Sequence, residues 1–291
     1  MAPSTDAPER IEVSADGLTF SALAWGGPEA PLALLLHGYP DTAWTWRHLG
    51  PYLARDGWRV VAPFTRGYGP TTVPRRGDYR VARLAEDVLA LAGAFGADDR
   101  AVLVGHDWGA LTVLRIAETH PGRFARLVSL AVPPPIVVLR PFGRWSQRGL
   151  GLRQLRLSWY ALFNTLPGAH RALDRLIPHL WRTWSPGYDA STDLAHLWDS
   201  LDTVDRRRAA LLYYRHNFVY AAKPLFLGSP TAPVLQLLGR QDGCVQAALV
   251  EASPGDLPVG SEWEVLEGCG HFMHLERPDD VNRRVADWLA P

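Results

Sequence analysis

An aspartate between two glycines is the residue of this chain best suited to do chemistry. It stands in the run Gly105-His106-Asp107-Trp108-Gly109, after the apolar residues 101 to 104 and before a helical pattern. This spacing is typical of the tight strand-to-helix corner G-x-S-x-G, with aspartate here in place of the serine nucleophile. The amino end of a helix favours a negative charge through its free N–H groups and its dipole. We therefore predict that Asp107 is a nucleophile that forms an ester, the alternative being a plain helix-capping role.

Two further polar residues follow apolar runs near the end of the chain. Asp242 closes the segment 239–242 after the mostly apolar residues 234 to 238, and His271 closes the segment 267–271 after residues 263 to 266. The order of nucleophile, acid and histidine along the chain is that of one known type of catalytic triad. We predict that His271 is the general base and that Asp242 orients its ring.

The neighbouring histidines and cysteine leave alternatives to these assignments. His274 competes with His271, but it falls inside the next helical turn, whereas His271 ends a glycine-containing loop. Asp242 taken alone would be an ordinary turn residue, and only its position relative to the other two favours a role. Cys269 is expected to be a small filler residue. His37 and His106 are expected to be hydrogen-bonding residues of their turns.

The elements that must position these residues alternate between strands and helices. A hairpin at Asp16-Gly17 predicts two antiparallel strands within residues 11–25. Buried strands are then predicted at 32–36, 58–63, 101–104, 124–132, 234–238 and 263–266, and helices at 43–55, 79–95, 110–120 and 278–289. Asp41 or Thr42 is expected to cap the first of these helices. Such alternation predicts an α/β fold with a mostly parallel, twisted sheet flanked by helices.

The alternation stops at Pro133-Pro134-Pro135. Residues 137 to 228 have a helical pattern, are rich in arginine and tryptophan, and contain no glutamate. Because ligands of open α/β sheets bind at the carboxyl edge of the strands, we expect this segment to be a helical lid over that edge. The predicted organisation is a core formed by residues 1–135 and 229–291, with a helical cap at residues 136–228.

Composition limits the function classes. The 291 residues carry a formal net charge of +0, which argues against nucleic acid or an anionic membrane as the main partner. Only Cys244 and Cys269 occur, so a reducing cytoplasm is the expected location. The first ten residues lack the apolar segment of a secretory signal, and we expect no membrane-spanning run. The sequence leaves open a monomer or a homodimer.

Four motifs together resemble those of a known family. They are His37-Gly38-Tyr39-Pro40, Arg66-Gly67-Tyr68-Gly69, the segment 105–109, and Gly270-His271-Phe272 followed by Glu276-Arg277-Pro278. The chain resembles the epoxide hydrolases of the α/β-hydrolase fold, with haloalkane dehalogenases as close cousins, over essentially everything after residue 10. The resemblance implies that the backbone N–H groups of Tyr39 and Trp108 form an oxyanion hole. It also implies a cis peptide bond between Tyr39 and Pro40.

The resemblance further implies that two lid tyrosines activate the epoxide oxygen. Tyr160 and Tyr214 stand at family-like positions, although a shift of one residue would exchange Tyr213 for Tyr214. Buried tyrosines more often simply pack and satisfy one hydrogen bond. The substrate pocket is expected to be apolar and partly aromatic, with contributions from His37, Pro40, His106, Trp159 and Phe163.

These residues lead to one functional prediction with two alternatives. We expect a hydrolase that uses water, without cofactor or metal, to convert a small hydrophobic epoxide to a vicinal diol through an aspartyl ester. A haloalkane dehalogenase with the same Asp107, Asp242 and His271 is the first alternative, although that group usually has asparagine where this chain has Tyr39. A hydrolase-fold binding protein without turnover is the second alternative.

Overall fold

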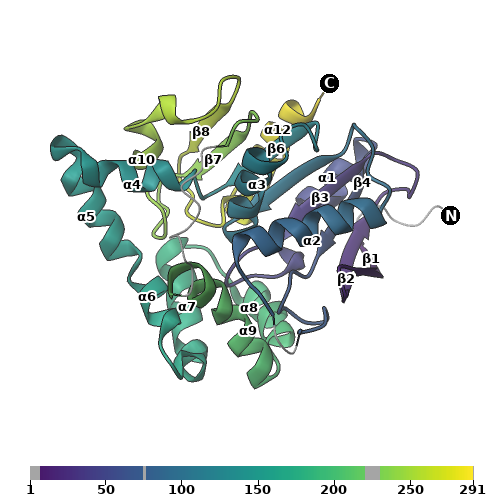
Figure 1. Cartoon of the computed structure of the whole chain (residues 1–291), viewed down its shortest axis with the longest axis horizontal. Helices are drawn as coiled ribbons and strands as arrows, with labels where there is room; N and C mark the ends of the chain where they lie inside the picture. Colours follow the sequence, from purple (N-terminus) through teal and green to yellow (C-terminus); the bar gives the residue numbers. More distant parts are fainter. Residues whose placement is uncertain (1–6, 75–76, 220–229, 291) are drawn as a thin grey trace.

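One sheet of eight strands organises the residues that this computed structural model describes, namely 7–74, 77–219 and 230–290 (Figure 1). The strand order is β1-β2-β4-β3-β5-β6-β7-β8. The β1–β2 and β2–β4 pairs are antiparallel and the other neighbours are parallel. The strands are β1 (Glu9–Ala15), β2 (Leu18–Trp25), β3 (Leu32–Leu36), β4 (Arg59–Pro63), β5 (Val102–His106), β6 (Arg126–Leu130), β7 (Leu235–Gly239) and β8 (Glu262–Leu266).

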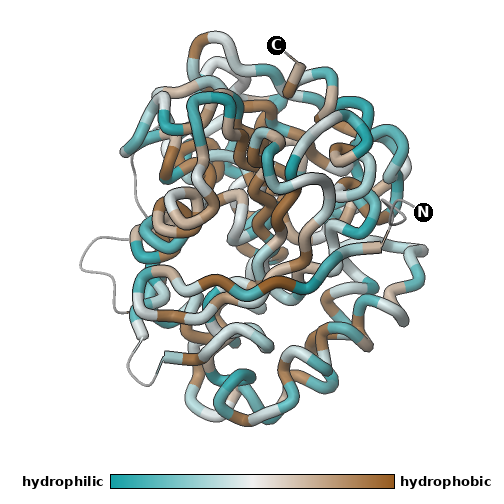
Figure 2. The backbone as a smooth tube through the Cα atoms, turned by 90° about the vertical axis from the view of Figure 1, so that its right-hand side faces the viewer, coloured by the Kyte–Doolittle hydropathy of each residue, from teal (hydrophilic) through white to brown (hydrophobic). Residues whose placement is uncertain are grey.

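Helices cover both faces of the sheet. Every residue of β3 and of β5 is buried, as expected of parallel strands covered on both sides. Apolar residues of α2 (Val81–Ala94) and α3 (Trp108–Thr119) build the core on one face, and those of α1 (Leu49–Arg55) and α12 (Pro278–Leu289) that on the other. Figure 2 shows the apolar segments running through the interior. The predicted α/β fold with a mostly parallel sheet is therefore confirmed.

A group of helices lies between β6 and β7 in the chain and forms the left and lower part of the molecule in Figure 1. The last ten residues before Pro230, residues 220–229, belong partly to the predicted cap and lie outside the described residues. The main helices are α4 (Pro135–Gly143), α5 (Arg148–Leu157), α6 (Trp159–Thr165), α7 (Leu173–Trp184), α8 (Ser191–Ser200) and α9 (Val204–Tyr214), which continues into a π-helical turn, η4 (Arg215–Val219).

The predicted helix over residues 43–55 was wrong as a single element. The chain forms a 3₁₀ turn, η1 (Ala43–Trp46), and then begins again as α1. Pro51 explains the break, because its ring nitrogen cannot donate the hydrogen bond that would continue a helix through this point. The side chain of Thr42 caps η1 by accepting from the backbone N–H of Trp44, so Thr42 rather than Asp41 is the capping residue.

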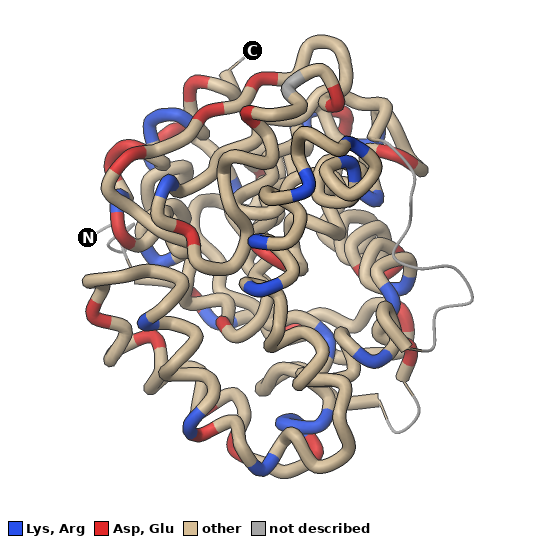
Figure 3. Tube along the Cα trace, turned by 90° about the vertical axis from the view of Figure 1, so that its left-hand side faces the viewer, with Lys and Arg blue, Asp and Glu red and all other residues tan. Residues whose placement is uncertain are grey.

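The outer surface carries charges of both signs. Figure 3 looks onto the side of the molecule that lies at the left of Figure 1, and arginines and carboxylates are both spread over it among the described residues. This spread fits the balanced net charge of the chain. Within the same described residues, none of the helices combines the length and the apolar composition that a membrane span needs.

Candidate active site

Asp107 stands at a sharp corner between β5 and α3. Its backbone has φ 53° and ψ −115°, a left-handed conformation that few residues other than glycine adopt. A Cβ atom on Gly105 would lie 2.3 Å from the carbonyl oxygen of Gly109, and one on Gly109 would lie 2.2 Å from that of Leu36. Both positions therefore require glycine, and the corner holds the aspartate in a strained conformation of the kind found at functional sites.

Two backbone N–H groups lie beside the carboxylate of Asp107. Oδ1 accepts a hydrogen bond of 2.7 Å from the N–H of Tyr39, and the Tyr39–Pro40 peptide is cis, as expected. A Cβ atom on Gly38 would lie 2.4 Å from Oδ1 and 2.6 Å from the backbone nitrogen of Trp108. Gly38, the Asp107 carboxylate and the Trp108 N–H therefore lie close together. The side chain of Asp107 makes no capping hydrogen bond to α3. Among the described residues, the backbone N–H that donates to this carboxylate is therefore that of Tyr39, with the N–H of Trp108 close by.

His271 lies between two carboxylates. Its Nδ1 is 2.8 Å from Oδ2 of Asp242, and its Nε2 is 3.6 Å from Oδ2 of Asp107. The other oxygen of Asp242 accepts from the backbone N–H groups of Cys244 and Val245, at 2.6 and 3.0 Å. Burial alone would lower the pKa of His271, but the charges and hydrogen bonds of Asp242 and Asp107 outweigh it and raise that pKa to about 10.

The end of α7 joins the helices between β6 and β7 to the loops that carry Asp242 and His271. The carbonyl oxygen of Trp184 accepts from the N–H of His271 at 2.9 Å and from the N–H of Gly243 at 3.3 Å. A Cβ atom on Gly270 would lie 2.2 Å from this oxygen, and one on Gly243 would lie 2.1 Å from the carbonyl oxygen of Thr183. Two glycines in the core loops therefore allow the close approach of a cap helix.

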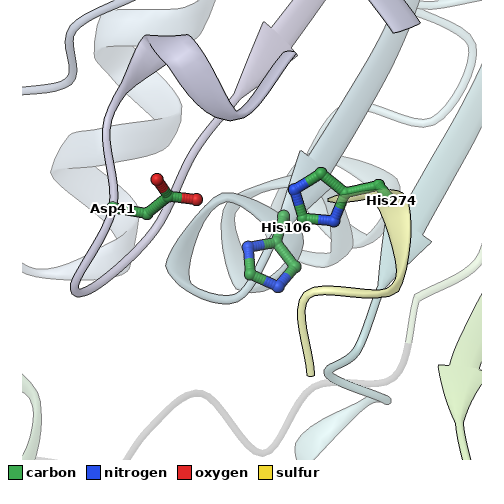
Figure 4. A group of neighbouring side chains, drawn as sticks. All are labelled: Asp41, His106 and His274. Atoms are coloured by element: carbon green, nitrogen blue, oxygen red, sulfur yellow. The ribbon is translucent and has the colours of Figure 1, made fainter. Parts of the chain in front are cut away.

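Behind the triad lies a buried cluster of Asp41, His106 and His274 (Figure 4). One ligand-type atom from each lies within 4.8 Å of the others. His106 Nε2 is 3.0 Å from the carbonyl oxygen of His271, and His274 Nε2 faces the hydroxyl of Thr45. Within the described residues, Oδ2 of Asp41 and Nδ1 of both histidines have no hydrogen-bond partner. His274 is thus held away from Asp107, which leaves His271 as the histidine that faces it.

Asp41 should make stability depend on pH. Burial, aided by the charge of Asp193 and opposed by Thr45, Thr42 and Arg47, raises the pKa of Asp41 from 3.8 to about 8. Between about pH 4 and pH 8 the folded chain then binds more protons than the unfolded chain, so this group destabilises the fold as pH rises, by up to about 1.4 kcal/mol per pH unit. Above about pH 8 the contribution levels off.

We expect the Asp41→Asn variant, which cannot ionise, to lose less free energy of unfolding between pH 5 and pH 8 than the unmodified chain. Urea unfolding at several pH values measures this difference. The neighbouring groups that titrate or carry charge, His106, His274, Asp193 and Arg47, are present in both proteins, so the difference between the two curves reports the ionisation of Asp41 and its coupling to them. Parallel stability curves for the two proteins would show that Asp41 is ionised in the fold.

Asp107 opens into a cavity of about 370 Å³ beneath the helices between β6 and β7. Its walls are largely apolar, which suits a hydrophobic ligand. Besides Asp107 and Trp108, the lining residues are Leu111, Val132, Pro133, Pro135, Val138, Leu139, Phe142, Gln154, Leu155, Ser158, Tyr160, Ala161, Tyr214, Asn217, Phe218, Cys244 and Val245.

Tyr160 of α6 and Tyr214 of α9 face this cavity from the cap. The Tyr160 hydroxyl lies 3.1 Å from the sulfur of Cys244. The Tyr214 ring packs edge-to-face on Tyr39 and Trp108, and its hydroxyl proton has no acceptor within hydrogen-bonding distance among the described residues. Burial raises the pKa of both phenols well above its ordinary value, so both are neutral hydrogen-bond donors.

Tyr213 is turned to the core instead. Its hydroxyl donates to the carbonyl oxygen of Arg66 at 2.6 Å, and it is absent from the cavity wall. The register of α9 therefore presents Tyr214, and not its neighbour, to Asp107. Of the two candidates that the sequence left open, only Tyr214 can reach a ligand in this cavity.

Five residues expected at the pocket do not line this cavity: His37, Pro40, His106, Trp159 and Phe163. Tyr160 and Asn164 form the buried side of α6, so Trp159 points outward and packs against Phe163 and His179 on the cap surface. His37 bonds to the backbone N–H of Thr65, and the carbonyl of Pro40 accepts from the indole of Trp181. None of the five side chains therefore faces the cavity at Asp107.

The sequence interpretation missed several cavity residues, above all Cys244. It stands two positions after Asp242, at the same carboxyl end of β7, so the argument that placed Asp242 at the sheet edge would also have placed Cys244 there. Gln154 and Asn217 come from helices whose exposed and buried faces the sequence pattern did not resolve.

Comparisons with known proteins agree with the fold. Residues 31–278 match the profile of the family described as alpha/beta hydrolase fold. Epoxide hydrolase A of Mycobacterium tuberculosis is 41% identical, covering 98% of each chain, and an epoxide hydrolase of Caballeronia sordidicola is 34% identical, covering 97% of this chain and 93% of the relative. A solved structure described under novel epoxide hydrolases in metagenomes from hot environments superposes with a TM-score of 0.81. It is 23% identical, and the match covers 97% of this chain and 98% of that one. This likeness shows the shared fold.

The chain therefore belongs to the α/β-hydrolase fold family. The resemblance to the epoxide hydrolases of that family, predicted from four sequence motifs, is confirmed by the full-length relatives. The family match and the full-length relatives together identify the protein as a hydrolase.

Proposed function

We propose that this hydrolase converts hydrophobic epoxides to vicinal diols through a covalent ester on Asp107. The observation that carries the proposal is one apolar cavity walled by an aspartate in an anion site on the core side and by two neutral tyrosines on the cap side. The names of the full-length relatives support the substrate class. Water is the second substrate, and the scheme requires no cofactor or metal.

In the first step, Asp107 opens the epoxide ring. Oδ1 is held by the N–H of Tyr39, so Oδ2, which faces His271, attacks a ring carbon. The C–O bond of the epoxide breaks, and its electron pair moves to the oxygen held by Tyr160 and Tyr214. One tyrosine gives its proton to this oxygen and the other donates a hydrogen bond. The product is a hydroxyalkyl ester of Asp107.

In the second step, His271 removes a proton from water through Nε2, and the hydroxide attacks the ester carbonyl carbon. Formation of the ester has removed the charge of Asp107, one of the groups that raise the pKa of His271, so the ring passes its own proton to the tyrosinate left by ring opening and can then act as a base. The N–H groups of Tyr39 and Trp108 stabilise the tetrahedral oxyanion. Collapse releases the diol, which takes the proton of the new carboxyl group, restores the Asp107 carboxylate and leaves His271 protonated as at the start.

We further propose that residues 136–228 act as the cap and residues 1–135 and 229–291 as the core. The helices between β6 and β7 and the cavity beneath them support this division. We place the protein in the cytoplasm, which its two unpaired cysteines support. Such an enzyme functions as a monomer or a homodimer.

The source of the new diol oxygen tests the covalent route. A single turnover of styrene oxide by excess enzyme in ¹⁸O-water should give unlabelled diol, because the first oxygen comes from Asp107, and mass spectrometry should find the label in the peptide that contains Asp107. Multiple turnovers should give labelled diol, which serves as the positive control. Solvent label in the first-turnover diol would instead mean direct attack by water. Release of bromide from 1-bromobutane at a rate comparable to diol formation would place the enzyme with the dehalogenases.

A further inference from the structure

Cys244 connects the triad to the cap. It is buried, its backbone N–H donates to Oδ1 of Asp242 at 2.6 Å, and its sulfur lies 3.1 Å from the hydroxyl of Tyr160. It also lines the cavity that opens at Asp107. The proposed hydrolysis uses no thiol, so this residue brings a chemical group into the site that the reaction does not need.

Three atoms that bind metal ions converge at this point. The sulfur of Cys244, a ring nitrogen of His271 and a carboxylate oxygen of Asp107 lie within 4.8 Å of one another. Nε2 of His271 is fully buried and makes no hydrogen bond among the described residues. Zinc takes tetrahedral sulfur, nitrogen and oxygen ligands at about 2.0–2.3 Å, which puts ligand atoms about 3.5 Å apart. Small side-chain rotations would close the triangle around an ion.

The cluster of Asp41, His106 and His274 offers similar ligand types but no route for an ion. None of the three lines the cavity, and all are buried behind the triad. The triangle at Cys244 differs because it faces a cavity large enough to admit a hydrated cation, and because thiolate selects soft cations such as Zn²⁺ and Cd²⁺ over Mg²⁺.

We propose that Cys244, His271 and Asp107 form an inhibitory site for a soft divalent cation, Zn²⁺ or Cd²⁺, which enters through the substrate cavity. Binding forms bonds from the metal to Sγ, Nε2 and a carboxylate oxygen, and the thiol proton and any proton on Nε2 pass to solvent. The bound ion occupies the nucleophile and the base together, so it blocks both steps. The inhibition rests on the proposed roles of Asp107 and His271, whereas the binding itself does not.

The test measures metal binding and activity separately on the full chain. Zn²⁺ or Cd²⁺ is titrated against a chromophoric chelator in a non-coordinating buffer, and turnover of styrene oxide is followed at the same free-metal concentrations. We expect one ion per chain, inhibition in proportion to occupancy, reversal by excess chelator, and no inhibition by Mg²⁺. Cys244→Ala should weaken binding by more than the roughly 10–100-fold that loss of an outer-shell partner costs. Its inhibition is judged against its own metal-free rate.

Matched variants separate the outcomes. Cys269→Ala removes the other buried thiol, which is absent from the cavity wall, and should leave metal binding unchanged. Cys244→Ser retains the size of the side chain, so a loss of metal binding in this variant does not come from misfolding. It should weaken Cd²⁺ binding more than Zn²⁺ binding, because the hydroxyl is a hard ligand. Unchanged binding in both Cys244 variants would overturn the proposal, as would the absence of binding in the unmodified chain. Binding through Cys244 in a chain that turns over no epoxide would instead refute the proposed function and leave the metal site standing.

Discussion

His271→Gln should stop catalysis after a single alkylation and leave the substrate attached to Asp107. Glutamine cannot take a proton from water, and loss of a general base typically costs about 10²–10⁴ in rate. Ring opening does not use this base, so the ester should still form. Mass spectrometry of the intact variant after mixing with styrene oxide should find the protein heavier by one substrate, and proteolysis should locate the added mass on Asp107.

His274→Gln is the matched control. It lies three residues further along, is equally buried, and contacts the hydroxyl of Thr45 rather than Asp107. This variant should lose stability but should hydrolyse its ester at a rate close to that of the unmodified enzyme. An adduct that accumulates in His274→Gln and not in His271→Gln would reverse the assignment of the base.

Removal of both cap hydroxyls should nearly abolish the ring-opening step. Tyr160→Phe and Tyr214→Phe should each slow alkylation by about 10²–10³, the usual cost of one donor aimed at developing charge. Both hydroxyls face the cavity as neutral donors. Hydrolysis of a pre-formed ester should change little, because the Tyr39 and Trp108 backbone serves that step. Rapid-quench measurement of adduct formation and decay separates the two rates.

Tyr213→Phe is the control in the same helix. Its hydroxyl bonds to the backbone of Arg66, so its loss should cost about 1 kcal/mol of stability and leave alkylation nearly unchanged. Slow alkylation in Tyr213→Phe with normal alkylation in Tyr214→Phe would mean that α9 presents the other tyrosine. Normal alkylation in all three variants would remove the basis for an epoxide substrate.

The sequence predicted the core well because its signals there are local and strong. The buried strand at 32–36 and the final helix at 278–289 agree with β3 and α12 at both ends. The former is an unbroken aliphatic run, and the latter begins at a proline. The corner at Asp107 was predictable because two glycines at this spacing permit a close approach of the backbone that any side chain would block.

The cap was predictable as helical but not in the direction of its side chains. Trp159 and Tyr160 are adjacent, and no local rule says which of two aromatic neighbours faces the core when both faces of α6 are partly apolar. The outcome depends on packing, since Tyr160 meets Trp184 of α7 and Tyr214 of α9, at ring distances of 4.7 and 5.9 Å. Cys244 was overlooked for a different reason, because a lone thiol carries no spacing signal of its own.

The hydrogen bonds between the end of α7 and the triad loops bear on how such proteins can be recombined. The Trp184 carbonyl accepts hydrogen bonds from the backbone of both His271 and Gly243. A chimera that exchanges the whole cap would therefore also replace the group that positions His271 and the loop after Asp242. A replacement cap would have to bring a carbonyl group to the same point, opposite glycines at 243 and 270. Libraries that vary the surface of the cap should therefore leave residues 183–185 unchanged. Crossover points within α7 should reduce activity strongly, although α7 is far from Asp107 along the chain.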